Sequence, residues 1–280
     1  MVLPYTVIDR EPWLQTSRVR QAIRDAINRR YDLIHYIYST VERTTYTAEP
    51  LMRAMWNEFP DEKRFLNVAS QFMFGDSILV APKVTRPQGV YKHMHKQLVK
   101  YALPQGQLWF NYYTKAKEVS TPEGQWVETA LSDLEQAVFV RAGSILPILL
   151  HDDCESLIPC MRNDIRLEVY PDSIYGAASG SLYLDDGASY EFTDRDNKSA
   201  RLNINFANFA LFVGVEHGNN YQDIPNVQSV VIYGVSEVPK SITTGDGSEL
   251  AFVQDLAKES IHVIMPDNTK AKDVYVKFNL

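Results

Sequence analysis

The sequence predicts a mainly β fold: two consecutive β-sandwiches, at residues 46–150 and 164–280, preceded by one long helix at residues 17–44. Three observations predict this class. Apolar residues recur at helical spacing near the N-terminus, short apolar or alternating runs recur roughly every ten residues after it, and Pro or Gly turns separate these runs. A chain of 280 residues is long enough for more than one domain.

Residues 1–16 are expected to form a loop that covers the end of the first helix, since two prolines interrupt them. Over residues 17–44, apolar side chains fall on one face of a helix, with Thr16 or Ser17 as the N-cap and Thr44 near the end. The apolar stripe is rich in tyrosine. We therefore expect this helix to pack against something larger than itself.

The densest fold-forming stretch is residues 71–84. Phe72 and Phe74 alternate across a short run, Gly75-Asp76 makes a turn, and residues 77–81 form a second apolar run, so a buried β-hairpin is expected. The other strands expected in the first sandwich are residues 51–56, 99–103, 107–113, 138–140 and 144–149, with turns at Pro104-Gln105-Gly106 and Ala142-Gly143.

A polar stretch at residues 151–163 is expected to link the two sandwiches. It holds both cysteines, Cys154 and Cys160, and their spacing leaves a short disulfide loop and two free thiols equally open. The strands expected in the second sandwich are residues 165–170, 180–184, 189–192, 201–206, 210–216, 229–233, 249–253, 261–265 and 274–278.

Charge and hydropathy exclude two classes of partner. With 28 Lys and Arg against 35 Asp and Glu, the formal net charge is -7 and no basic run exceeds two residues, so nucleic acid is not expected as a partner. The longest strongly apolar run, residues 145–150, is far below the roughly 18 residues that a membrane span needs. The N-terminus lacks the charged and apolar regions of a signal peptide.

Motifs for metal binding or modification give weak signals. His93 and His95 would share one face of a strand, but no acidic or thiol ligand stands at a matching spacing, so a solvated loop is favoured. Asp185-Asp186-Gly187 resembles half of a calcium loop and is better interpreted as a turn. Asn197-Lys198-Ser199 has the acceptor pattern for N-glycosylation, which is also common by chance.

Several segments occur in a familiar order: RDAINRRYDLIHYIYS, EPLMRAMWNEFP, QFMFGDSILVAPKV, YALPQGQLWFNYY, FVRAGSILPI and GSLYLDDGASYEF. Over residues 8–195 their order and spacing resemble the C-terminal end of the α-glucosidases of glycoside hydrolase family 31. The REPW text at residues 10–13 most resembles the members that trim glucose from N-glycans in the endoplasmic reticulum.

The resemblance implies an anatomy for the chain. Residues 1–45 would be the end of a catalytic (β/α)8 barrel with its last helix, and residues 46–150 would be the proximal sandwich. Residues 151–163 would be the linker and residues 164–280 the distal sandwich.

The resemblance implies no catalytic residue in this chain. A retaining glycosidase uses two carboxylates about 5 Å apart, and the family carries them on earlier barrel strands. No W-x-D-M-N-E text occurs in the sequence. Only Asp9, Arg10 and Trp13, near the end of the last barrel strand, are expected to lie close to a substrate, and the chain alone is expected to be inactive.

In the complete enzyme, the resemblance implies retaining hydrolysis of an α-linked glucose with no metal or organic cofactor. The substrate would be an α-glucosidic oligosaccharide or N-glycan held by the barrel, the compartment the lumen of the endoplasmic reticulum, and a regulatory β subunit a partner. Ala54 and His35, where the family usually has Pro, and Ala142, where it usually has Gly, indicate a divergent member.

A second hypothesis is a stand-alone carbohydrate-binding or interaction module. Trp109, Phe110, Tyr112 and Tyr113 are clustered, and β-sandwiches often present aromatic side chains to sugars. A core strand with outward tyrosines is the favoured interpretation of that cluster.

Overall fold

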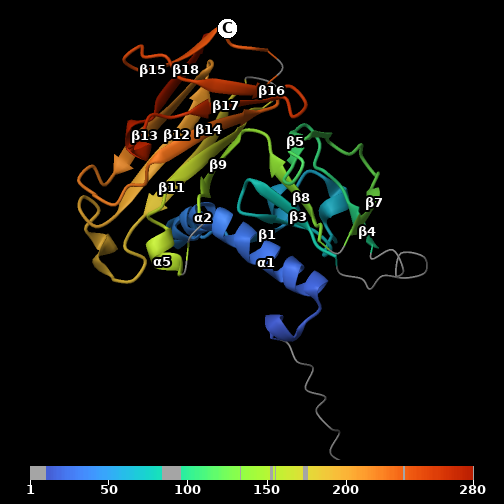
Figure 1. Cartoon of the computed structure of the whole chain (residues 1–280). Helices are drawn as coiled ribbons and strands as arrows, with labels where there is room; N and C mark the ends of the chain where they lie inside the picture. The colour runs from blue at the N-terminus through green and yellow to red at the C-terminus, as the bar shows by residue number, and fades with distance from the viewer. Residues whose placement is uncertain are drawn as a thin grey trace, which may run out of the picture.

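The structure is a computed structural model of the chain, and it describes residues 11–83, 96–132, 134–151, 154, 156–172, 176–235 and 237–279. In this part of the chain, strands form a six-stranded sheet, a ten-stranded sheet and a two-stranded sheet. Figure 1 shows the ten-stranded sheet beside the two smaller sheets, with the N-terminal helices below them. The mainly β fold class is confirmed.

The predicted single helix is two helices, α1 (Ser17–Asp32) and α2 (Ile34–Thr47). They are divided at Leu33, whose backbone lies outside helical geometry at φ -91° and ψ 5°. Thr16 is the N-cap of α1, as expected, and its hydroxyl accepts a hydrogen bond from the Val19 amide. The division lets α2 pack between the sheets and bury side chains, whereas α1 buries none.

The six-stranded sheet has the order β1-β2-β3-β8-β5-β6. Its strands are β1 (Met52–Ala54), β2 (Phe72–Phe74), β3 (Ile78–Ala81), β5 (Leu108–Asn111), β6 (Lys117–Val119) and β8 (Ala137–Arg141). The predicted hairpin is confirmed, with Phe72 opposite Val80 and Phe74 opposite Ile78. Residues 51–56 are a strand only in part, because the chain turns into the short helix α3 (Met55–Glu58).

The strands expected on both sides of the Pro104 turn form, but they do not pair with each other. β4 (Lys96–Tyr101) pairs with β7 (Val127–Ser132) as the two-stranded sheet, while β5 pairs with β6 and β8. The remaining short helical turns of the described chain are η1 (Pro12–Leu14), η2 (Lys63–Phe65), α5 (Leu157–Cys160), η3 (Glu191–Thr193) and η4 (Ala271–Asp273).

The ten-stranded sheet has the order β15-β18-β13-β12-β11-β9-β10-β14-β17-β16. Its strands are β9 (Ser144–Leu149), β10 (Ile165–Tyr170), β11 (Ala178–Leu184), β12 (Ala200–Ala207), β13 (Ala210–His217), β14 (Val227–Tyr233), β15 (Ser241–Thr244), β16 (Phe252–Asp255), β17 (Ser260–Ile264) and β18 (Tyr275–Asn279). The prediction of a strand at residues 189–192 is wrong, because the short helical turn η3 begins there. The sequence analysis did not predict β15.

The expectation that residues 144–149 belong to the first sandwich is wrong, because these residues form β9 of the ten-stranded sheet. The turn at Ala142-Gly143 carries the chain from the first sheet into the ten-stranded sheet, where β9 lies between β10 and β11. All six residues of β9 are buried. Ile145 and Leu149 belong to the core of the ten-stranded sheet, while Leu146 and Ile148 pack toward the six-stranded sheet. A strand covered on both faces has a continuous apolar sequence.

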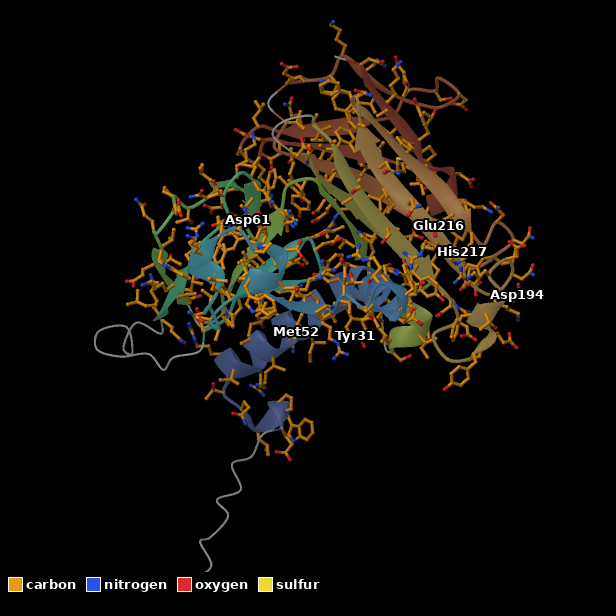
Figure 2. The ribbon with its side chains drawn as sticks, turned by 180° about the vertical axis from the view of Figure 1, so that it is seen from behind. Tyr31, Met52, Asp61, Asp194, Glu216 and His217 are labelled. Carbon is orange, nitrogen blue, oxygen red and sulfur yellow. A yellow bond between two sulfur atoms is a disulfide. The ribbon has the colours of Figure 1, made fainter. Side chains whose placement is uncertain are left out.

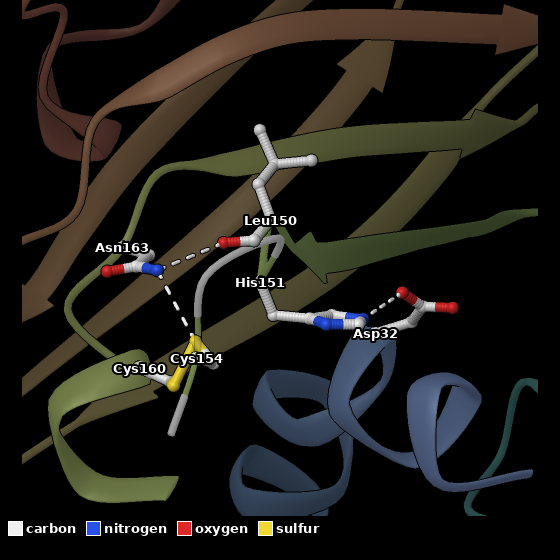
Figure 3. The surroundings of a disulfide bond; sticks show 6 residues. All are labelled: Asp32, Leu150, His151, Cys154, Cys160 and Asn163. Atoms are coloured by element: carbon white, nitrogen blue, oxygen red, sulfur yellow. Dashed lines mark hydrogen bonds and ion pairs between the residues drawn. A yellow bond between two sulfur atoms is a disulfide. The ribbon is translucent and has the colours of Figure 1, made fainter. Parts of the chain in front are cut away.

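The linker contains a disulfide between Cys154 and Cys160, the first of the two alternatives that their spacing left open. Figure 3 shows the bridge beside Asn163, whose amide donates to the Leu150 carbonyl at 3.3 Å. In the same region, His151 Nε2 lies 2.9 Å from the Asp32 carboxylate at the end of α1. The contact between His151 and Asp32 ties the start of the linker to α1.

Candidate functional site

Of the three predicted substrate-proximal residues, only Trp13 lies in the part of the chain that the structure describes. Asp9 and Arg10 lie outside the described residues, as do His93 and His95. Trp13 is on η1 with 70% of its surface exposed, and it does not line the groove described below. The proximity of these three residues to a substrate stays a prediction.

The aromatic cluster of the second hypothesis is mostly core. Trp109 and Phe110 are fully buried, and Tyr112 is also buried. The Trp109 indole donates to the Pro104 carbonyl at 3.3 Å. Since sugar rings need exposed aromatic faces, these three side chains do not offer a sugar platform. The core interpretation is confirmed for Trp109 and Phe110, whereas Tyr112, which was expected to point outward, is buried.

The acidic segment after β11 is a turn, as expected. The Asp185 carboxylate accepts from the Gly187 amide at 2.8 Å, and the Asp186 carboxylate accepts from the Ala188 and Ser189 amides. The Tyr38 hydroxyl of α2 donates to Asp185 at 2.7 Å. Within the described ranges, no group of three or more His, Cys, Asp or Glu side chains could hold a metal ion.

The described part of the chain contains a polar groove of about 570 Å³, which we call the helix groove. One wall is α2, and the other is formed by Asp76 and Ser77 together with residues 141–143. Its floor is the face of β9, β11 and β12 that points away from the core of the ten-stranded sheet. The floor side chains are Ser144, Ser179, Ser181, Asn203 and Asn205.

Alternation along β12 could have revealed this floor. Leu202, Ile204 and Phe206 belong to the core, so Asn203 and Asn205 must point to the opposite face. Glu216 on β13 also lines the groove and accepts from the Asn203 amide at 3.2 Å. Glu216 and His217 lie at the end of β13 near the loop that carries Asp194 (Figure 2). The alternation predicts the strand, but it does not indicate that Asn203 and Asn205 line a groove.

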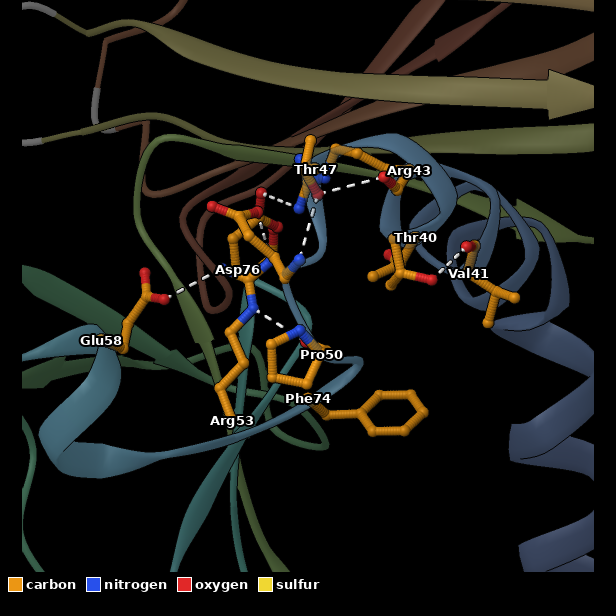
Figure 4. A network of polar contacts seen from close by, with 12 residues as sticks. Thr40, Val41, Arg43, Thr47, Pro50, Arg53, Glu58, Phe74 and Asp76 are labelled. Carbon is orange, nitrogen blue, oxygen red and sulfur yellow. Dashed lines mark hydrogen bonds and ion pairs between the residues drawn. The ribbon is translucent and has the colours of Figure 1, made fainter.

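The arginines of the helix groove are paired with acids. Arg43 contacts Asp76 at 2.8 Å, as Figure 4 shows. Arg201 forms an ion pair with Glu42. Burial by itself would raise the pKa of Asp76, but the neighbouring Arg43 guanidinium and the Ser77 hydroxyl lower it below its usual value. Arg43 and Asp76 are therefore both charged at neutral pH.

The third arginine, Arg141, belongs to a network that ties the walls together. It contacts Glu58 at 2.8 Å, and Glu58 also contacts Arg53 at 3.0 Å. Arg53 is buried and reaches Glu49 at 3.0 Å as well, directly after α2. Each arginine of the groove thus has an acidic partner, and Glu216 adds a further carboxylate to the lining.

A second polar cluster lies at the junction of the two large sheets and is structural. Glu168 on β10 is 2% exposed, and it accepts hydrogen bonds from Lys115 at 2.8 Å and from the Tyr170 hydroxyl at 2.6 Å. Burial would raise the pKa of Glu168, yet Lys115 and Arg166 outweigh it and lower the pKa. Lys115 comes from the turn between β5 and β6, so the pair links the two sheets.

These features define the class of the protein: a mainly β chain of two large sheets joined through a helix pair. Residues 48–146 match the family model described as the glycosyl hydrolase family 31 C-terminal domain. No helix in the described part of the chain is both long and apolar enough to cross a membrane.

Relatives of the chain are α-glucosidases. It is 31% identical to the "Probable glucan 1,3-alpha-glucosidase" of Oryza sativa subsp. japonica over 85% of this chain and 25% of the relative. It is 27% identical to the "Neutral alpha-glucosidase AB" of Homo sapiens over 88% of this chain and 25% of the relative. The chain therefore spans about a quarter of the length of the curated relatives it matches.

The fold is shared with a solved glucosidase. The ER glucosidase II heterodimeric complex, which consists of a catalytic subunit and the binding domain of a regulatory subunit, gives a TM-score of 0.79 at 16% identity. The match covers 97% of this chain and 30% of that chain. At this identity the likeness shows the fold alone.

Proposed function

We propose that this chain acts as the C-terminal part of a retaining α-glucosidase that removes α-linked glucose from an oligosaccharide or N-glycan. The observation that carries the proposal is the match of residues 48–146 to the family 31 C-terminal domain model, together with the α-glucosidases that the chain resembles. The catalytic carboxylates would come from a barrel outside residues 1–280, and the chain alone would be inactive.

In this proposal, residues 1–45 complete the barrel and residues 46–143 form the proximal domain. Because β9 lies in the ten-stranded sheet, residues 144–150 belong to the distal domain together with residues 164–280, on either side of the 151–163 linker. The exposed surface of α1 supports the proposal that residues 1–45 pack against a barrel. Val19 and Ile27 lie on one side of α1 and are 41% and 50% exposed, and no residue of this helix is buried. An amphipathic helix of this kind buries its apolar stripe against a neighbour.

The proposed compartment is the lumen of the endoplasmic reticulum, with a regulatory β subunit as partner. The Cys154–Cys160 disulfide supports this location, because disulfides persist in oxidising compartments and are rare in the cytosol. The shared fold with the ER glucosidase II complex is consistent with both parts of the proposal.

A chimera tests the function. The N-terminal three quarters of the rice relative would be joined to this chain, and hydrolysis of a nitrophenyl α-glucoside would be measured. We expect activity from the chimera and none from the chain alone. Activity of the chain alone, or equal activity of the rice portion with and without this chain, would refute the proposal.

A matched variant tests the role of α1. Ile27→Asp places a charge on the exposed apolar face, and Arg24→Asp, on a polar position of the same helix, is the control. We expect Ile27→Asp to reduce the chimera's activity at least tenfold and Arg24→Asp to leave it within twofold. Equal activities of the two variants would contradict barrel packing through this face.

A further inference from the structure

One row of side chains crosses five neighbouring strands on the face that points away from the core. The register places Ser144 beside Ser179, Ser179 beside Asn205, Asn205 beside Phe212, and Phe212 beside Tyr275. Directly paired residues point to the same face of a sheet. Because strands lie about 4.8 Å apart, the row spans about 19 Å.

The first half of the row is polar and lies on the floor of the helix groove. Within the described chain, the side chains of Ser179, Ser181 and Asn205 make no hydrogen bond to protein, although each can donate and accept. Ser181 stands opposite Asn203 in the parallel row next to the first. These groups are free to bond the hydroxyls of a ligand.

The second half of the row is aromatic. Phe212 and Tyr275 are 42% and 41% exposed, while the residues that follow them, Val213 and Val276, pack in the core. Across the groove, Tyr46 at the end of α2 is 59% exposed and lines the opposite wall. Exposed aromatic faces pack well against the apolar face of a sugar ring.

Charge selects the class of ligand. Arg43, Arg141 and Arg201 each form an ion pair with an acidic side chain, and Glu216 is a further carboxylate in the groove lining. A free guanidinium would recruit an anion, but a paired one offers no net positive charge. The groove therefore favours a neutral ligand rich in hydroxyl groups.

We infer that the helix groove and its aromatic extension bind a neutral oligosaccharide, with polar contacts to Asn205 and ring packing on Phe212 and Tyr275. The row is long enough for several sugar units. This inference does not depend on the proposed enzymatic role, because it assigns binding to the chain itself.

The test is calorimetric titration of the purified 280-residue chain. The probes are an α-linked glucose tetrasaccharide and a glucosylated high-mannose N-glycan, with a sulfated tetrasaccharide as the charged comparison. We expect one or both neutral probes to bind with a millimolar or lower dissociation constant and the sulfated probe to bind at least tenfold more weakly. Which neutral probe binds identifies the source of the ligand.

Variants locate the site. Asn205→Ala and Phe212→Ala should each weaken binding at least fivefold, and Tyr190→Ala, an 88% exposed tyrosine that does not line the groove, should leave it unchanged. All three positions are at least partly exposed, so circular dichroism should show unaltered folding. No binding of either neutral probe, binding as tight as that of the wild type by the Asn205 and Phe212 variants, or preference for the sulfated probe would overturn the inference. Failure of the chimera assay would leave it standing.

Discussion

At the scale of single residues, Gly75 shows why one position tolerates only glycine. Its φ is +65°, and a Cβ built there would lie 2.0 Å from the Tyr36 hydroxyl oxygen. That hydroxyl donates to the Phe74 carbonyl at 2.7 Å and accepts from the Ser77 amide at 3.2 Å. The turn was predictable from Gly-Asp, but its contact with a helix almost forty residues earlier was not.

Gly75→Ala is expected to lower the free energy of unfolding by about 2 kcal/mol more than Gly106→Ala does. Both glycines have positive φ, but an added Cβ at Gly106 meets nothing within 4 Å. The backbone cost of about 1–2 kcal/mol is common to both, so the difference isolates the clash with Tyr36. Urea unfolding measures the free energy of unfolding of both variants. Equal losses of stability would contradict the close contact between Gly75 and Tyr36.

His35 carries a pH dependence. It is fully buried, and neither ring nitrogen has a hydrogen-bond partner among the described residues. Burial lowers its pKa from 6.5 to about 4. The unfolded chain therefore takes up a proton below pH 6.5 while the folded chain does not, so stability falls as the pH drops from 6.5 to 4.

We expect this histidine to account for about 3 kcal/mol of lost stability between pH 7 and pH 4. His35→Leu removes the titrating group and keeps an apolar side chain of similar size. Unfolding free energies measured at both pH values should therefore fall less in the variant than in the wild type. Identical pH dependence of the two proteins would show that His35 does not remain neutral in the folded state.

At the scale of elements, the Lys115–Glu168 pair joins the β5–β6 turn to β10. Lys115→Met leaves a buried carboxylate with one fewer cation, which costs about 3 kcal/mol. Lys117→Met is the control, because the Lys117–Glu259 pair is 38% and 49% exposed and should be worth less than about 1 kcal/mol. Chemical denaturation measures the free energy of unfolding of both variants. Similar losses of stability in the two variants would mean that the buried Lys115–Glu168 pair contributes little to stability.

Element types were largely predictable from sequence, and their partners were not. The hairpin and β10 follow from alternation or from short apolar runs bounded by turns. The division of the helix at Leu33 and the transfer of β9 into the larger sheet depend on packing from both sides, which periodicity does not report. Residues 189–192 look like a strand but lie in an acidic turn region where the backbone bonds to nearby carboxylates.

At the scale of the whole molecule, the disulfide links structure to compartment. Cys154 and Cys160 close a short loop, and the unfolded-chain entropy model gives about 2 kcal/mol for a loop of that length. We expect the Cys154→Ser/Cys160→Ser variant to lose about that much stability. Protein purified from an oxidising compartment should show no free thiol in denaturant, and two free thiols would contradict the bridge.

By itself, the sequence determined the mainly β class, the positions of most strands and the resemblance to family 31, because alternation, turns and short motifs are local properties. Only the tertiary structure decided which strands share a sheet, that the Trp109 cluster is core, and that Asn205, Phe212 and Tyr275 lie in one row. That row joins strands separated by more than a hundred residues, and register across a sheet arises from long-range pairing that no local pattern encodes.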